Sequence, residues 1–123
     1  MLYMLLLYSR PDIAFPADGM QRHISVYEDT TSKGQYVISE ALGDGSNGKV
    51  VRNHEGGVVT DGPFVETKEF LGGFYLLECR DLDEAIDLAR RIPAVERGSV
   101  EIRPILELPA EYATAAAAMG SAG

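Results

Sequence analysis

The chain has 123 residues, of which 46% are hydrophobic and 24% are charged, proportions typical of one globular domain rather than a disordered chain. Its formal net charge is −8, and its lysines and arginines form no cluster. Because such a surface repels a phosphate backbone, we expect no nucleic-acid partner.

The cysteine and the apolar start of the chain indicate its compartment. Cys79 is the single cysteine, so it cannot form an internal disulfide, and its apolar neighbours favour a small buried side chain. The apolar run 2–8 is too short to cross a bilayer, and no basic segment precedes it as in a secretory signal. We therefore expect a cytoplasmic protein with no membrane partner.

The first half of the chain predicts a strand, a helix and a second strand. Residues 2–8 are apolar on both strand faces, which is typical of a central strand. A helix is predicted over 18–33, because Asp18 stands three residues before Gln21 in a capping-box arrangement. Residues 36–42 alternate enough to form the second strand. The helix stripe expected to face the core is Met20, His23, Ile24 and Tyr27.

The second half predicts a hairpin, a strand, a helix and a final strand. Asp81, with Glu84 three residues later, is expected to cap the helix, which Pro93 ends. The predicted strands are 49–54 and 58–60 in the hairpin, then 71–79, then 99–108, with an Ala-rich tail over 110–123. The apolar stripe expected on this helix is Leu82, Ala85, Ile86, Ala89 and Ile92.

Apart from the hairpin, this order repeats strand, helix, strand twice, which predicts a ferredoxin-like α+β fold with an antiparallel sheet. Two helices can cover only one face of such a sheet. The apolar residues of the other face need a cover, so we expect a homodimer that joins sheet to sheet.

The stretch from Thr60 to Tyr75 has the most unusual composition in the chain. Asp61-Gly62 is a turn dipeptide, and Pro63 fixes its own backbone angle, so the chain must turn there. The strand that follows opens on Gly72-Gly73. Because paired glycines weaken a strand, something usually needs the room that they leave.

The motifs Asp-Gly-Pro-Phe, Glu-Thr-Lys-Glu and Leu-Gly-Gly-Phe-Tyr, with the later segments 81–85 and 98–104, resemble the YCII-related family in its DGPF-domain branch. The resemblance covers Met1 to about Glu107, and we take residues 1–109 as the domain. It implies a dimeric α+β barrel. A relative in the wider family is a dehydrochlorinase, and genes of the DGPF branch often accompany those of alternative sigma factors.

His23 is the candidate proton-transfer group, because an imidazole can take or give a proton near neutral pH. The resemblance implies, at the corresponding place, a histidine suspected to pair with an aspartate. Asp61 is the predicted partner and Glu40 the second choice, since a carboxylate would orient the ring and stabilise its charged form. The alternative is an ordinary helix histidine, hydrogen-bonded to backbone or water.

The candidate substrate-binding residues are charged or lack a side chain. Glu66 and Glu69 could hold Lys68 or a ligand amine, while Lys68 could meet an anionic group. Arg103 could neutralise a carboxylate, although pairing with a neighbouring glutamate is the simpler interpretation. Alternatively, Asp61 only organises its turn and the charges are solvated. The predicted set is Glu40, Glu66, Lys68, Glu69, Gly72, Gly73 and Arg103.

Two functions from different classes follow. His23 and His54 lie on different predicted elements and give no metal-ligand spacing, and no phosphate-binding glycine loop is present, so we expect no metal and no cofactor. The first function is a cofactor-free acid–base enzyme that performs elimination or isomerisation on a small polar or aromatic molecule. The second is a non-catalytic regulatory module that binds a small molecule or a protein, with a link to sigma-factor regulation.

Overall fold

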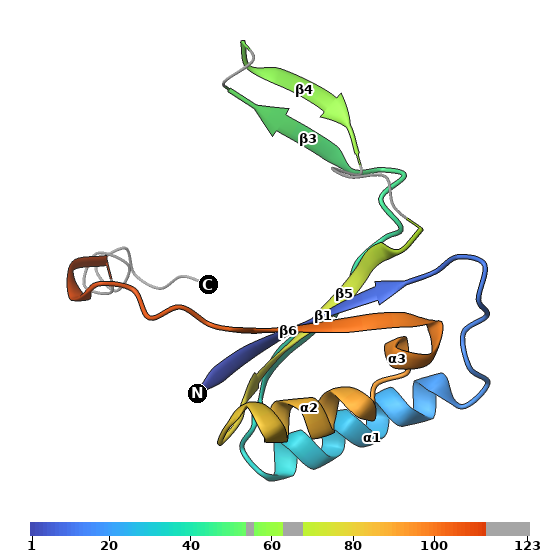
Figure 1. Ribbon diagram of the computed structural model, residues 1–123, viewed down its shortest axis with the longest axis vertical. Coiled ribbons are helices and arrows are strands. Elements are labelled where there is room, and N and C mark those ends of the chain that lie inside the picture. Colours follow the sequence, from blue (N-terminus) through green and yellow to red (C-terminus); the bar gives the residue numbers. More distant parts are fainter. Residues whose placement is uncertain (54–55, 63–67, 113–123) are drawn as a thin grey trace.

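The computed structural model describes residues 1–53, 56–62 and 68–112 (Figure 1). Within these ranges the elements are, in chain order, β1 (Leu2–Ser9), α1 (Gly19–Ser32), β2 (Tyr36–Ala41), β3 (Lys49–Arg52), β4 (Val58–Asp61), β5 (Phe70–Glu78), α2 (Leu82–Arg90), α3 (Ala94–Arg97) and β6 (Gly98–Pro104).

The main sheet has four antiparallel strands in the order β2-β5-β1-β6. With β3, β4 and the one-turn helix α3 set aside, the chain runs strand, helix, strand, strand, helix, strand, and β1 and β5 occupy the centre. This confirms the predicted ferredoxin-like α+β fold. Strands β3 and β4 pair only with each other, and Figure 1 shows this hairpin projecting away from the sheet and its helices.

The core lies between the sheet and the helices. Along the two central strands, Leu5 pairs with Tyr75, and both side chains are at most 5% exposed. Their neighbours in sequence point to the opposite face, where they are only partly buried, because successive strand residues alternate between faces. These residues of the opposite face include Met4, Leu6, Phe74 and Leu76. The buried cluster is Tyr3, Leu5, Leu7, Val26, Tyr75, Leu77, Cys79, Ala85, Leu88, Ala89, Ile92 and Ala94.

Helix α1 turns a different stripe to the core from the one predicted. Met20, Ile24 and Tyr27 are 63%, 47% and 48% exposed, so the predicted stripe is wrong except for the partly buried His23. The buried residues of α1 are Gly19, Val26 and Thr30.

The α1 residues that are buried are small or have their polar atoms hydrogen-bonded, and they are not the most hydrophobic residues of the helix. The Thr30 hydroxyl donates to the Val26 carbonyl oxygen at 2.7 Å, so Thr30 enters the core without an unpaired polar atom. The predicted capping box of this helix is also absent, since the Asp18 side chain caps no backbone N–H.

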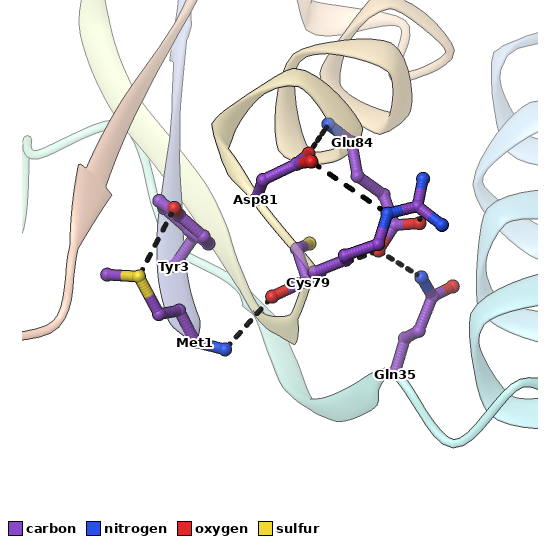
Figure 2. A network of polar contacts seen from close by, with 7 residues as sticks. Met1, Tyr3, Gln35, Cys79, Asp81 and Glu84 are labelled. Carbon is purple, nitrogen blue, oxygen red and sulfur yellow. Dashed lines mark hydrogen bonds and ion pairs between the residues drawn. The ribbon is translucent and has the colours of Figure 1, made fainter.

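Helix α2 begins with the predicted cap. The Asp81 carboxylate accepts a hydrogen bond from the Glu84 N–H at 2.9 Å, as Figure 2 shows. Glu84 accepts from the Arg80 N–H at 2.8 Å, one residue earlier than a full capping box requires. Glu84 also accepts from the Gln35 amide at 3.0 Å, which ties the start of α2 to the chain just before β2.

The predicted stripe of α2 is only partly correct. Ala85, Ala89 and Ile92 are buried as predicted, whereas Leu82 is 49% exposed and Leu88 takes its place in the core.

Strand β6 is shorter than predicted. It ends at Pro104 rather than at Leu108, because Pro104 pairs with Tyr3 and the neighbouring β1 begins only one residue earlier. One more backbone hydrogen bond follows, from the Ile105 N–H to the Leu2 carbonyl oxygen at 2.9 Å, and the side chains from this point on are exposed. These side chains are Ile105, Leu106 and Leu108. Of the predicted tail, only 110–112 lies within the described ranges.

The core makes a testable prediction at Leu77, whose side chain is 0% exposed. Leu77→Ala should lower the free energy of unfolding by about 2–5 kcal/mol, because it removes buried methyl groups and leaves a cavity. Leu106→Ala, at a side chain that is 78% exposed, is the control and should change it by less than about 0.5 kcal/mol. Urea denaturation followed by circular dichroism measures both. Equal losses in the two variants would contradict this placement of the core.

Candidate active site

His23 and Tyr75 form the centre of the candidate site. Nδ1 of His23, on the inner side of α1, lies 2.6 Å from the Tyr75 hydroxyl oxygen, on the central strand β5. The two rings are almost parallel, at 10°, with centroids 5.9 Å apart. Because Tyr75 is 5% exposed and stands in the middle of the sheet, it holds the imidazole from a rigid position.

Both groups are electrically neutral at neutral pH. Burial raises the pKa of Tyr75 to about 12, so its phenol keeps its proton. Burial, and then the positive charge of Arg22, lower the pKa of His23 from its ordinary value of 6.5. Arg22 is itself fixed by an ion pair with Glu96 at 2.8 Å. The site therefore presents an uncharged imidazole.

The second ring nitrogen of His23 is open to a ligand. Within 1–53, 56–62 and 68–112, the hydrogen bond of this side chain is the one between Nδ1 and the Tyr75 hydroxyl. No side-chain nitrogen or oxygen in these ranges is both buried and without a partner, so Nε2 keeps contact with solvent. An imidazole that is anchored through Nδ1 and free at Nε2 can take a proton from a bound molecule, or give one to it.

Aromatic side chains surround this pair. The Phe15 ring lies parallel to that of His23, at 6° and with centroids 6.2 Å apart. The Tyr36 hydroxyl lies 2.7 Å from the Ser39 hydroxyl, and the Tyr27 ring meets Tyr36 edge to face at 4.8 Å. Ser39 pairs with Tyr75 across β2 and β5, so these side chains continue the same face of the sheet. The surroundings suit a flat, partly polar ligand.

The structure does not bring Asp61 and His23 together. Asp61 lies at the end of β4, is 81% exposed, and forms an ion pair with Lys49 across the hairpin. Among the described residues β4 pairs only with β3, and Figure 1 shows this hairpin apart from α1. Glu40, the second choice, pairs with Phe74 on the opposite face of the sheet from Tyr75. In this chain, the hydrogen-bond partner of His23 is a phenol rather than a carboxylate.

Of the remaining predicted residues, Glu69 and Arg103 lie near one another, beside Tyr8. The Glu69 carboxylate accepts a hydrogen bond from the Ser99 hydroxyl at 3.0 Å, beside an open cleft of about 360 Å³. Arg103 pairs with Glu101 at 3.0 Å, which is the simpler of its two interpretations. Lys68 is exposed before β5, and Glu66 lies outside the described residues.

In the glycine pair of β5, packing explains why position 73 is a glycine. A Cβ on Gly73 would lie 2.8 Å from the Glu40 carbonyl oxygen, so the room is filled by the backbone of β2. At Gly72 a Cβ would make ordinary contacts with the Phe70 ring at 3.4 Å, the Ser9 hydroxyl at 3.6 Å and the Leu7 carbonyl oxygen at 3.9 Å.

Sequence reasoning missed Tyr75. The available signal was the alternation of β5, which puts Tyr75 on the same face as Leu77, together with the need of a buried phenol for a hydrogen-bond partner. Among the described residues, no three His, Cys, Asp or Glu side chains gather in a way that could hold a metal ion. Nor is any helix in those ranges long and apolar enough to span a membrane.

Comparison with known proteins gives three findings. The family model of the YCII-related domain matches residues 1–109. An uncharacterised protein of Rhizobium meliloti (strain 1021) is 54% identical over 50 residues, which are 39% of this chain and 40% of that protein. A solved structure of 5-chloro-2-hydroxyhydroquinone dehydrochlorinase from Burkholderia phenoliruptrix AC1100, in complex with 2,5-dihydroxybenzoquinone, is 14% identical, with a TM-score of 0.42 over 88% of this chain and 96% of that one.

The pKa of His23 gives the testable prediction of this site. Its imidazole should titrate below 6.5 in the folded protein, because burial and Arg22 both disfavour the charged form. Arg22→Gln should move the pKa upward, whereas Arg80→Gln, at an exposed arginine beside the start of α2, should leave it unchanged. NMR titration of the ring protons, assigned with His23→Gln, measures all three. A wild-type pKa at or above 6.5 would contradict this description.

Folding lowers the pKa of His23, so the unfolded chain binds this proton more readily than the folded protein does. A fall in pH should therefore destabilise the folded state through this residue. Protonation of the unfolded chain begins as the pH falls through its ordinary pKa of about 6.5. As the pH drops below this value, the contribution of His23 to the free energy of unfolding should therefore decrease. His23→Gln should remove this part of the pH dependence.

Proposed function

Because this chain belongs to the YCII-related family, we propose that it is a small enzyme that performs acid–base chemistry without a cofactor, with His23 as the proton-transfer group. The observation that carries the proposal is the hydrogen bond of 2.6 Å between Nδ1 of His23 and Tyr75, which leaves Nε2 free on the open side. Membership of the DGPF branch within this family remains a prediction.

The proposed step begins with a neutral imidazole that carries its proton on Nδ1. Nε2 takes a proton from the substrate, and the electron pair of the broken bond stays on the substrate. The imidazolium then donates its Nδ1–H to the Tyr75 oxygen, which fixes the orientation of the ring. In an elimination, the retained pair forms a double bond while a leaving group departs with its own pair. In an isomerisation, the same proton returns to another carbon.

A phenol partner makes His23 a weaker base than a carboxylate would. Tyr75 stays uncharged, since its pKa is about 12, and so it adds no negative charge to hold the proton on the imidazole. A weak base suits substrates whose proton is already acidic, such as phenols or carbons beside a carbonyl group. The aromatic neighbours Phe15, Tyr27 and Tyr36 favour a small aromatic member of this class.

The two residues make different contributions, which mutation should separate. His23→Gln should reduce kcat by about 10²–10⁴-fold, the usual contribution of a general base. Tyr75→Phe should reduce it less, because the base remains and only its hydrogen-bond partner is lost. The measurement is turnover of a panel of enolisable and halogenated phenolic compounds, followed by absorbance and mass spectrometry.

A third variant tests the choice of partner. Asp61→Asn should retain activity, since the Asp61 carboxylate contacts Lys49 on the hairpin. Loss of turnover in Asp61→Asn with full activity in Tyr75→Phe would identify the carboxylate as the working partner. Saturable binding without turnover in any variant would favour the non-catalytic binding module instead.

We also propose that two copies pair through the sheet face that the helices leave open. The partly buried side chains of this face include Leu6 and Phe74, and at its edges Leu2 and Ile38 are 36% and 43% exposed. An apolar face of this kind gains free energy when a second copy removes it from water.

Association of two copies is tested by a charge on the open face. Leu6→Glu should shift the protein from dimer to monomer in analytical ultracentrifugation, because an unpaired carboxylate would be buried between the copies. Leu82→Glu is the matched control, as this side chain is 49% exposed on α2 and should leave the dimer intact. A wild-type protein that stays monomeric at all concentrations would refute the pairing.

A further inference from the structure

Phe15 lies over the site without belonging to the core. It stands in the segment between β1 and α1, which has no regular structure, and its side chain is 44% exposed. The backbone around it is fixed by hydrogen bonds: Arg97 Nε donates to the Ile13 carbonyl oxygen at 2.8 Å, and the Gly19 N–H donates to the Pro16 carbonyl oxygen at 2.9 Å. The ring is therefore an exposed side chain on an anchored loop, and it lies parallel to the imidazole of His23.

The seat of this ring is Gly19, the first residue of α1. A Cβ at Gly19 would lie 2.4 Å from both Cε2 and Cζ of Phe15, which is a steric clash. Gly19 is not among the glycines with positive φ, so its backbone does not demand glycine. The ring itself is what explains the missing side chain, since glycine otherwise weakens a helix relative to alanine.

We propose that Phe15 is an aromatic gate over His23 and the residue that selects flat aromatic ligands. In the closed state its ring rests on Gly19 and lies beside the imidazole; a ligand ring enters by displacing it and stacks against its face. Met20 follows Gly19 on α1, and Ile24 follows His23. Their exposed side chains give the entrance an apolar rim. This inference rests on the proposed role of His23.

The chemistry of the entrance defines the ligand class. Phe15 offers a π-face and no hydrogen-bonding group, whereas the open Nε2 of His23 offers one polar contact at the inner end. Parallel aromatic rings in offset arrangements attract each other beyond the area that they bury. The fitting ligand is a single flat ring with a hydroxyl or other acidic group on its rim. A saturated ring of the same size would lose the stacking and keep the hydrogen bond.

The test uses diethyl pyrocarbonate, which acylates neutral imidazole, and so reports access to His23 whether or not the protein is an enzyme. The modification of His23 is followed by peptide mass spectrometry, which separates it from His54. Phe15→Ala should accelerate it several-fold. Gly19→Ala should do the same, because the new Cβ would displace the Phe15 ring from its position against Gly19. The Phe15 side chain is flexible, so it can move without disturbing the backbone.

Three controls separate a gate from a packing effect. Gly19→Ala should keep or raise Tm, since alanine favours the helix more than glycine does. Leu82→Ala removes an exposed apolar side chain on α2, outside the entrance, and should leave the modification rate at the wild-type value. Phenol should slow the modification of the wild type, cyclohexanol should not, and Phe15→Ala should weaken protection by phenol about two- to tenfold.

Wild-type modification rates in both Phe15→Ala and Gly19→Ala would overturn the gate. Equal protection by phenol and cyclohexanol would overturn the selection of aromatic ligands. If turnover is absent while the accelerated modification and the protection by phenol are both observed, the proposed enzymatic function fails and the aromatic gate stands.

Discussion

The hydrogen bond between His23 and Tyr75 joins the first helix to the middle of the sheet, and the candidate site depends on it. Its position follows from the register of β1 and β5, which sets Tyr75 opposite Leu5 on the face that the helices cover. Within that layer a phenol needs a partner, and His23 is the group of α1 that supplies it. The same contact satisfies a buried polar atom, orients an imidazole and leaves its other nitrogen exposed. Stability and the proposed chemistry therefore depend on the same interaction.

The order of the elements, except for the one-turn helix α3, could be predicted because it depends on local signals. Alternation marked the strands, and the Asp81 cap marked the start of α2, where the predicted hydrogen bond to Glu84 is present. The failures are non-local. The length of β6 depends on where β1 begins, and the stripe of α1 depends on which side chains the sheet can accommodate, so hydrophobicity alone chose Met20 and Ile24 wrongly.

The site could be predicted only in part for the same reason. His23 could be proposed from its residue type and its place on a helix face, both of which are visible in the sequence. Its partner was not, because the distance between an α1 side chain and a β5 side chain follows from strand register and helix rotation. Asp61 has a suitable carboxylate for the role, but its strand pairs only within the hairpin. Arg103 and Glu101, two residues apart on one strand face, met as simple spacing suggests.

The burial of Cys79 has a practical consequence. The side chain is 1% exposed directly after β5, and burial, with Glu84 nearby, raises the pKa of its thiol above the ordinary value. A thiol that stays protonated and covered reacts slowly with maleimides and iodoacetamides, since the thiolate is the nucleophile. It is also the single cysteine of the chain. A fluorophore or spin label can therefore be attached at an introduced surface cysteine without first removing the native one, and distances between such labels can report the position of the β3–β4 hairpin relative to the sheet.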